Sequence, residues 1–100
     1  MNSQYSIDGY KITVFASEDF GFSSSFKVGK LPNGQWVIIK DRKSRIIMKD
    51  GHIIKEQAKI IIDMVDANKV CMGTTAPVCS KTKLFLEELD IDVFSLEKIL

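Results

Sequence analysis

The sequence predicts an α+β domain: a three- to four-stranded antiparallel sheet packed by one amphipathic helix, with a helical carboxy-terminal corner. Apolar and polar residues alternate over much of the first half, as they do in half-buried strands. From residue 54 onward, apolar residues recur at spacings of three and four, which is typical of helices. The chain has 100 residues, enough for one hydrophobic core and too few for two, so residues 1–100 are expected to form a single domain.

Alternating residues predict the first strands of antiparallel hairpins that span residues 10–54. Residues 10–16 read YKITVFA and alternate strictly, and residues 22–28 follow the same rule. The tetrad Leu31-Pro32-Asn33-Gly34 is typical of a β-turn, because proline presets its second position and asparagine and glycine tolerate the others. The strand that follows, residues 35–40, is apolar on both faces, which predicts a central strand covered by helices.

A fourth strand is expected from Arg45 to Lys49. Residues 41–44 would turn the chain into it, and Asp50-Gly51 would turn the chain out again. This arrangement places Arg42 and Lys43 at a hairpin tip.

The second half is expected to be helical. Ile54, Ala58, Ile61 and Val65 form an apolar stripe that predicts a helix over residues 54–67. A further helical segment is expected over residues 76–100, beginning near Thr75. The predicted core combines both halves of the chain: Ile12, Val14, Phe26, Val28, Trp36, Ile38, Ile47, Ala58, Ile61, Ile62, Val65, Phe85, Leu86 and Leu89.

The carboxy-terminal residues leave three arrangements open. A helix that closes on Leu89, a turn at residues 90–92 and a second helix resemble the apolar spacing of a helix-turn-helix. Asp90, however, stands where that motif has its turn glycine, and the second helix offers few groups that read base edges. A plain helical corner is preferred, and a strand over residues 91–94 is the remaining alternative.

Charge is distributed unevenly along the chain. The formal net charge is +1, but the stretch from Lys27 to Lys55 holds eight cations and two aspartates. The remainder of the chain is therefore acidic, and the basic stretch is the first candidate binding surface. Its candidate residues are Lys40, Arg42, Lys43, Arg45 and Lys49.

A second candidate surface combines acidic and apolar residues near the carboxyl terminus. Its residues are Glu87, Glu88, Asp90, Asp92, Phe94 and Glu97. Such a surface could occupy a cationic groove of a protein partner.

No motif of catalysis, cofactor binding or metal binding is present. The sequence lacks a glycine-rich phosphate loop, a nucleophile elbow and paired metal ligands, and His52 is its only histidine. No catalytic residue, cofactor, metal or small-molecule substrate is therefore predicted. Cys71 and Cys79 are expected to be free thiols.

The preferred interpretation is a small soluble regulator that is not an enzyme and acts as an adaptor or inhibitor. It would work through contact with a protein partner or with a second copy of itself. The alternative is a nucleic-acid-binding module that uses the basic hairpin region 27–55. The polar amino terminus and the short apolar runs predict a cytoplasmic protein with no membrane segment.

Overall fold

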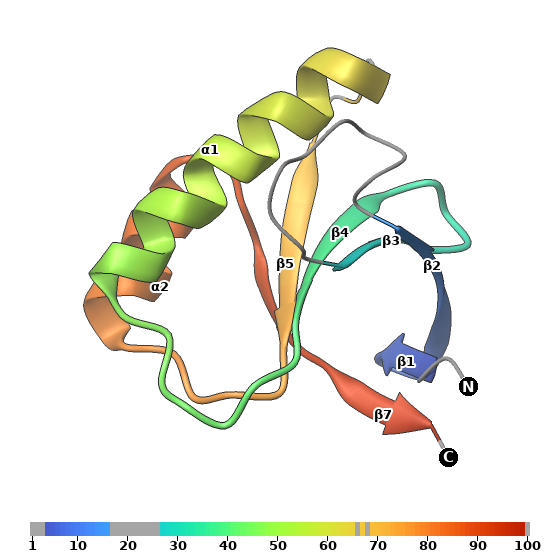
Figure 1. Ribbon diagram of the computed structural model, residues 1–100, viewed down its shortest axis with the longest axis horizontal. Coiled ribbons are helices and arrows are strands. Elements are labelled where there is room, and N and C mark those ends of the chain that lie inside the picture. Colours follow the sequence, from blue (N-terminus) through green and yellow to red (C-terminus); the bar gives the residue numbers. More distant parts are fainter. Residues whose placement is uncertain (1–3, 17–26, 66, 68, 100) are drawn as a thin grey trace.

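The computed structural model describes residues 4–16, 27–65, 67 and 69–99 (Figure 1). In this part of the chain, strands and helices follow one another in the order β1 (Gln4–Ile7), β2 (Tyr10–Ala16), β3 (Lys27–Lys30), β4 (Trp36–Lys40), α1 (Met48–Val65), β5 (Val70–Thr74), α2 (Ser80–Glu88), β6 (Val93–Ser95) and β7 (Glu97–Ile99).

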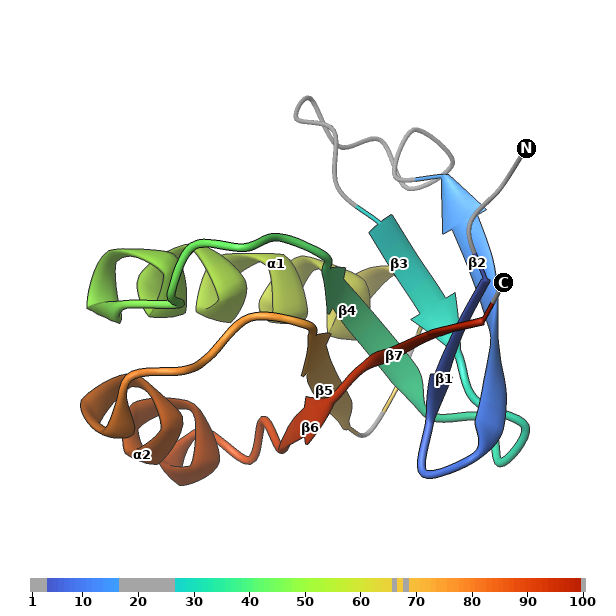
Figure 2. The ribbon, with the colours of Figure 1, turned by 90° about the horizontal axis from the view of Figure 1, so that it is seen from below.

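The strands form one mixed sheet that nearly closes into a barrel. Their order is β6-β5-β4-β3-β2-β1-β7. Only Leu96 separates β6 from β7, so one extended segment pairs with β5 at one edge of the sheet and with β1 at the other. Figure 2 shows this segment crossing from β5 toward β1. The resulting barrel has a filled interior and carries both helices on its outside (Figures 1 and 2).

The predicted antiparallel sheet with one covering helix is therefore wrong. β5 pairs in parallel with both β4 and β6. Parallel neighbours need a long crossover connection, and α1 and α2 provide the two crossovers. Hydrophobic periodicity locates strands but does not reveal which strands pair, so the sequence pattern missed the barrel.

Three local predictions in the first half are confirmed. Strand β2 has the predicted bounds, and the backbone N–H of Gly34 donates to the Leu31 carbonyl at 2.9 Å, which closes the predicted β-turn. β4 lies between β3 and β5, and its three central residues are buried. Residues 22–26 of the second predicted strand lie outside the described residues, and β3 begins at Lys27.

The predicted strand from Arg45 to Lys49 is replaced by a loop and the start of α1. At this end of α1, Oδ2 of Asp50 accepts the N–H of Ile47 at 2.9 Å, which satisfies a donor that helix geometry leaves unpaired. Gly51 belongs to the helix and lies close to α2, because a Cβ atom there would lie 3.1 Å from Thr82 Cγ2. The Asp-Gly pair therefore begins a helix and does not form a hairpin turn.

The predicted helical segment over residues 76–100 is also wrong in its second half. α2 ends at Glu88, and Asp90 adopts a φ of 62°. The N–H of Ile91 donates to the Leu86 carbonyl at 2.9 Å, which is the closing hydrogen bond of a Schellman motif. Asp90 thus takes the left-handed position that glycine often fills, and strands β6 and β7 follow in place of a second helix.

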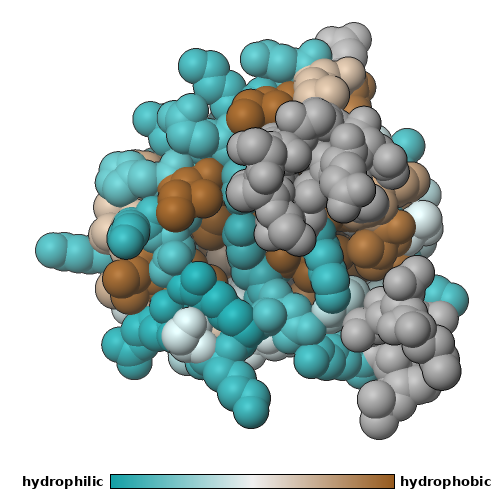
Figure 3. All heavy atoms as spheres, in the orientation of Figure 1, coloured by the Kyte–Doolittle hydropathy of each residue, from teal (hydrophilic) through white to brown (hydrophobic). Residues whose placement is uncertain are grey.

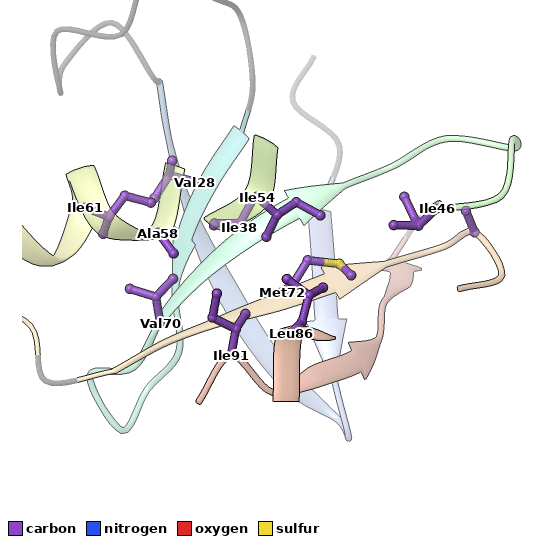
Figure 4. Close-up of a cluster of buried hydrophobic side chains, with 11 residues drawn as sticks. Val28, Ile38, Ile46, Ile54, Ala58, Ile61, Val70, Met72, Leu86 and Ile91 are labelled. Carbon is purple, nitrogen blue, oxygen red and sulfur yellow. The ribbon is translucent and has the colours of Figure 1, made fainter. Parts of the chain in front are cut away.

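Buried side chains form two clusters on opposite sides of the sheet. The first lies between the sheet and the helices (Figure 4) and contains Val28, Ile38, Ile46, Ile54, Ala58, Ile61, Val70, Met72, Ala76, Leu86 and Ile91. The second fills the barrel and contains Tyr5, Ile7, Ile12, Val37, Ile39, Cys71 and Leu96. The sequence pattern found the first cluster better, because helical stripes mark it.

Most of the predicted core residues in the described part of the chain are buried or partly buried. Two are wrong: Ile47 and Leu89 are 48% and 40% exposed. Ile47 directly precedes α1, whose start the sequence pattern misplaced, and Leu89 is the C-cap residue of α2. Phe26 lies outside the described residues.

Glycine makes room inside the barrel where strands curve most closely around the interior. A Cβ atom on Gly29 of β3 would overlap with Ile12 Cγ2. On Gly73 of β5 it would lie 3.1 Å from Ile7 and 3.2 Å from Leu96. Interior side chains therefore occupy the space above both glycines.

Among the described residues, no helix is both long enough and apolar enough to span a membrane.

Candidate nucleic-acid interface

The carboxyl ends of the parallel strands β4 and β5 place several polar residues at one end of the barrel. Asp41 and Arg42 follow β4 directly, and Thr75 follows β5. Parallel neighbours end at the same edge of a sheet, and ligands of open α/β sheets commonly bind there.

Five residues meet at this end through the carboxylate of Asp41, and we call them the Asp41 cluster. They come from or directly follow five different strands: Tyr5 (β1), Lys27 (β3), Asp41 (β4), Thr75 (β5) and Lys98 (β7). The Tyr5 hydroxyl and the Lys98 ammonium both donate to Oδ2 of Asp41, at 2.7 and 3.0 Å. The Thr75 hydroxyl donates to Oδ1 at 3.1 Å, and Lys27 donates to the Tyr5 hydroxyl oxygen at 2.8 Å.

The Asp41 cluster keeps its carboxylate ionised. The hydrogen bond from Tyr5, followed by those from Lys98 and Thr75, lowers the pKa of Asp41. Tyr5 itself is fully buried, so its ring belongs to the barrel core while its hydroxyl reaches the polar end. Two lysines and one aspartate leave the cluster with a net positive charge.

Arg42 organises the loop that follows the cluster. Its guanidinium pairs with both carboxylate oxygens of Asp50, with an Nη1–Oδ1 distance of 3.1 Å. It also donates to the backbone carbonyls of Ser44 and Arg45, at 3.2 and 3.0 Å. The ion pair with Arg42 lowers the pKa of Asp50. Arg42 therefore holds the loop against the start of α1, while Lys43 and Arg45 remain exposed.

Lys40 ends β4 and is half-buried. Burial lowers the pKa of its ammonium group, and the nearby positive charge of Arg42 lowers it further. The carboxylate of Asp50 acts in the opposite direction.

A hollow of about 610 Å³ opens at this end of the molecule. It is lined by Asp41, Arg42, Lys43, Thr75 and Lys98. Figure 3 shows hydrophilic side chains gathered over the lower part of the molecule, where the loop after β4 runs in Figure 1. Three of the five lining side chains are cationic, and Lys98 is 52% exposed. The hollow is therefore suited to an anionic group with several oxygen atoms.

The first predicted set of site residues is partly brought together by the fold. Its members Lys40, Arg42, Lys43, Arg45 and Lys49 run from the end of β4 to the first turn of α1. The hairpin tip predicted for Arg42 and Lys43 is wrong, because a loop and a helix follow β4. The set stays a prediction as a binding surface, with Arg42 already engaged by Asp50.

The other residues of this end were not predicted from the sequence. Tyr5, Thr75 and Lys98 are distant in sequence from the basic stretch and reach it only through strand pairing. Lys27 lies within that stretch, but nothing in its local pattern indicates a bond to Tyr5. Only the closure of the sheet by β7, which the pattern does not reveal, brings Lys98 to this place.

The second predicted surface is divided among the end of α2, β6 and β7. Asp92 forms an ion pair with Lys69 at 2.9 Å, which raises the pKa of that lysine, and Asp90 terminates α2. Phe94 packs against the barrel core. Glu87, Glu88 and Glu97 are exposed. This acidic surface also stays a prediction.

The described residues contain no group of three or more histidine, cysteine, aspartate or glutamate side chains placed to hold a metal ion. Both cysteines are free, as expected. Burial raises the pKa of Cys71 to about 12. Backbone N–H groups of Lys81 and Thr82 at the start of α2 lower the pKa of Cys79.

The fold is shared with three solved structures. EndoMS in a complex with dsDNA superposes with a TM-score of 0.69 at 16% identity, over 91% of this chain and 38% of that one. EndoMS in its apo form gives 0.57 at 17% identity, over 70% and 33% of the two chains. A repair endonuclease from Pyrococcus abyssi gives 0.60 at 13% identity, over 75% and 34%.

These identities establish a common fold and leave the activity open. The chain covers between 33% and 38% of the length of these proteins. A scan against known protein families found no match, and a search of curated proteins found none either.

The comparison corrects one functional expectation. The sequence led us to expect a protein that is not an enzyme, but the fold that the chain adopts occurs in a repair endonuclease. The alternative prediction of a nucleic-acid-binding module fits these neighbours better than the preferred prediction of a regulator that contacts proteins.

Proposed function

We propose that this chain binds nucleic acid through the end of the barrel at which β4 and β5 terminate. The observation that carries the proposal is the hollow lined by Arg42, Lys43, Thr75 and Lys98. Phosphate groups are the feature common to all nucleic acids, and lysine and arginine side chains supply most of the affinity for them. The occurrence of the fold in a protein solved with dsDNA supports the same conclusion.

The residues at this end would contribute unequally. Lys43 and Lys98 are exposed and able to reach phosphate oxygens, and Lys98 also donates to the carboxylate of Asp41. Arg42 is held by Asp50 and by two carbonyl groups, so its main contribution is to hold the loop in place. Contacts of this kind fix the position of a strand without reading its sequence. We therefore expect the contacts at this end of the barrel to depend little on base order.

The test compares two double variants of equal charge. Lys43→Ala with Lys98→Ala removes two cations from the proposed interface, and Lys55→Ala with Lys59→Ala removes two exposed cations from α1. Fluorescence anisotropy with a labelled duplex and a labelled single strand should show a loss of about tenfold or more for the first variant. Little change is expected for the second.

Equal losses in the two variants would mean that total charge, and not this surface, determines binding. An absence of binding by the unmodified protein at low salt would end the proposal. Circular dichroism of both variants establishes that they remain folded.

Cleavage of the bound strand is a second candidate function, because the fold occurs in a repair endonuclease. Lys40 is the residue on which we would expect such chemistry to depend, because it lies half-buried at the carboxyl end of β4 and burial lowers the pKa of its ammonium group. Incubation of supercoiled plasmid with divalent cations should then give nicked product for the unmodified protein and none for Lys40→Met. No nicking by the unmodified protein would exclude this candidate while leaving the binding proposal intact.

A further inference from the structure

A second cavity opens at the opposite end of the barrel. It measures about 480 Å³ and lies where the β1–β2 and β3–β4 turns meet β6, and Figure 2 shows the two turns at this end of the sheet. Its lining residues are Ile7, Asp8, Tyr10, Leu31, Pro32, Asn33, Gln35 and Phe94. The volume falls within the range of small-molecule sites.

The inner part of this cavity is apolar, and its outer part is aromatic. Ile7, Leu31 and Phe94 belong to or pack against the cluster that fills the barrel. Tyr10 stands at the rim and is 63% exposed, although the alternation of β2 predicts that it shares a face with the buried Ile12. A large aromatic side chain exposed beside an apolar hollow offers a stacking surface for a flat ring.

The rim of the cavity carries few polar side chains, and its charge is negative. Among the described residues that line the cavity, Asp8 is the only charged one, and none of the hydrogen bonds or ion pairs within the described part of the chain engages its carboxylate. Oδ1 of Asn33 accepts the N–H of Gln35 at 2.9 Å, which leaves its amide group to act as a donor. A phosphate would meet the carboxylate of Asp8 and no lysine or arginine, so the cavity is unsuited to an anion.

Tight turns hold the rim in one conformation. Asp8 and Gly9 both have positive φ values, 51° and 83°, as in a two-residue hairpin, and Ile7 pairs with Tyr10 across it. The carboxylate and the aromatic ring are therefore attached to a short, well-defined loop. A site built in this way requires little reorganisation when a ligand enters.

From this geometry we propose that the cavity binds a planar, uncharged ring that carries two adjacent N–H donors, and that the ring is guanine. The ring would stack on Tyr10 with one face, and its N1–H and exocyclic amine would donate to the carboxylate of Asp8. Inosine, which lacks the exocyclic amine, keeps only one of these two donors. This proposal rests on the proposed function in one respect only: the guanine would be an unpaired base of the bound nucleic-acid strand.

Nucleosides test the site independently of phosphate binding. ¹⁵N-labelled protein is titrated with guanosine, inosine and cytidine, and the amide resonances of Gly9, Leu31, Asn33 and Gly34 are followed. Guanosine should shift these resonances, while inosine should bind about tenfold more weakly because a hydrogen bond to a charged group is lost. Cytidine should give no saturable shift.

Two variants at the rim complete the test. Asp8→Asn suits the turn, because asparagine followed by glycine favours positive φ at both positions, and it should weaken guanosine binding about tenfold. Tyr10→Ala should abolish the shifts, and the Lys43→Ala, Lys98→Ala protein should retain them. A thermal melt shows that each variant is folded.

The outcomes separate this proposal from the preceding one. No shift with guanosine at its solubility limit, or equal affinity for guanosine and inosine, would overturn the site even if duplex binding is observed. If guanosine binds, a thymine oligonucleotide containing one guanine decides the source of the ring. Shifts with this oligonucleotide show that a strand supplies the base, and shifts with the nucleoside alone show that a free nucleoside is the ligand.

Discussion

The two ends of the barrel differ in chemistry although β1, β3 and β4 reach both. At one end, β4 and β5 terminate in a cluster of cations organised by Asp41 and Arg42. At the other, two hairpin turns surround a mostly apolar hollow with a single carboxylate. We therefore propose separate roles for the two ends: phosphate binding at the cationic end and binding of an unpaired base at the apolar end.

The interior that joins the two ends should be the most sensitive to substitution. Gly29→Val would place a Cβ atom and two methyl groups in space that Ile12 Cγ2 already occupies. We expect a loss of about 3 kcal/mol in the free energy of unfolding, the upper part of the usual range for overpacking. Urea denaturation measures it, with Lys30→Val on the exposed face of the same strand as the control. Equal losses in the two variants would contradict the account of the interior.

Two tyrosines provide a direct comparison of the ends. Tyr5→Phe removes the hydroxyl that links Lys27 to Asp41, so we expect a loss of about 1–2 kcal/mol in the free energy of unfolding. Tyr10→Phe removes an exposed hydroxyl at the apolar end and should change stability by less than about 0.5 kcal/mol. Chemical denaturation of both variants measures the difference. Similar values for the two would show that the Asp41 cluster contributes no stability.

Acid should lower the free energy of unfolding, because it protonates Asp41 and Asp50 at the cationic end of the barrel. The pKa values of Asp41 and Asp50 are lowered below the ordinary value of 3.8 in the folded protein. Their stabilising effect is thus complete above that value and is lost as the pH falls through the lower folded pKa values. Denaturation at pH values from 5 down to 2 should show a decline below about pH 4, and the decline should be shallower in Asp41→Asn. An identical decline in that variant would indicate that other carboxyl groups are responsible.

The cysteines should differ in reactivity with little effect on stability. Cys71 is buried inside the barrel, and its pKa is raised to about 12. The pKa of the partly exposed Cys79 is lowered by backbone N–H groups. Iodoacetamide at pH 8 should therefore modify Cys79 in the native protein and Cys71 only after unfolding, as mass spectrometry of peptides would show. Rapid modification of Cys71 in the native state would mean that the barrel opens readily.

Local features of the fold were predictable from the sequence, and its closure was not. The alternation of β2, the Leu31–Gly34 turn and the apolar β4 follow from side-chain periodicity and turn chemistry. The start of α1 was misplaced because Asp50-Gly51 is equally suited to a turn, and its use depends on the bonds of Asp50 to Arg42 and Ile47. Asp90 likewise ends α2 in a conformation that sequence pattern assigns first to glycine.

The candidate interface was predictable only in part, for the same reason. Lys40, Arg42 and Lys43 are neighbours in sequence, so a count of charges finds them. Lys98 and Thr75 join them through the pairing of β7 with β1 and of β4 with β5. Such long-range contacts depend on the whole sheet and leave no local signal.

The salt dependence of nucleic-acid binding tests the central claim most directly. Logarithms of the association constant for a labelled duplex are plotted against the logarithm of the salt concentration for the unmodified protein and for Lys43→Ala, Lys98→Ala. The account predicts that the variant's slope is smaller by about two, because each phosphate contact contributes about one. An unchanged slope, with the Lys55→Ala, Lys59→Ala protein behaving in the same way, would contradict the assignment of phosphate binding to this end of the barrel.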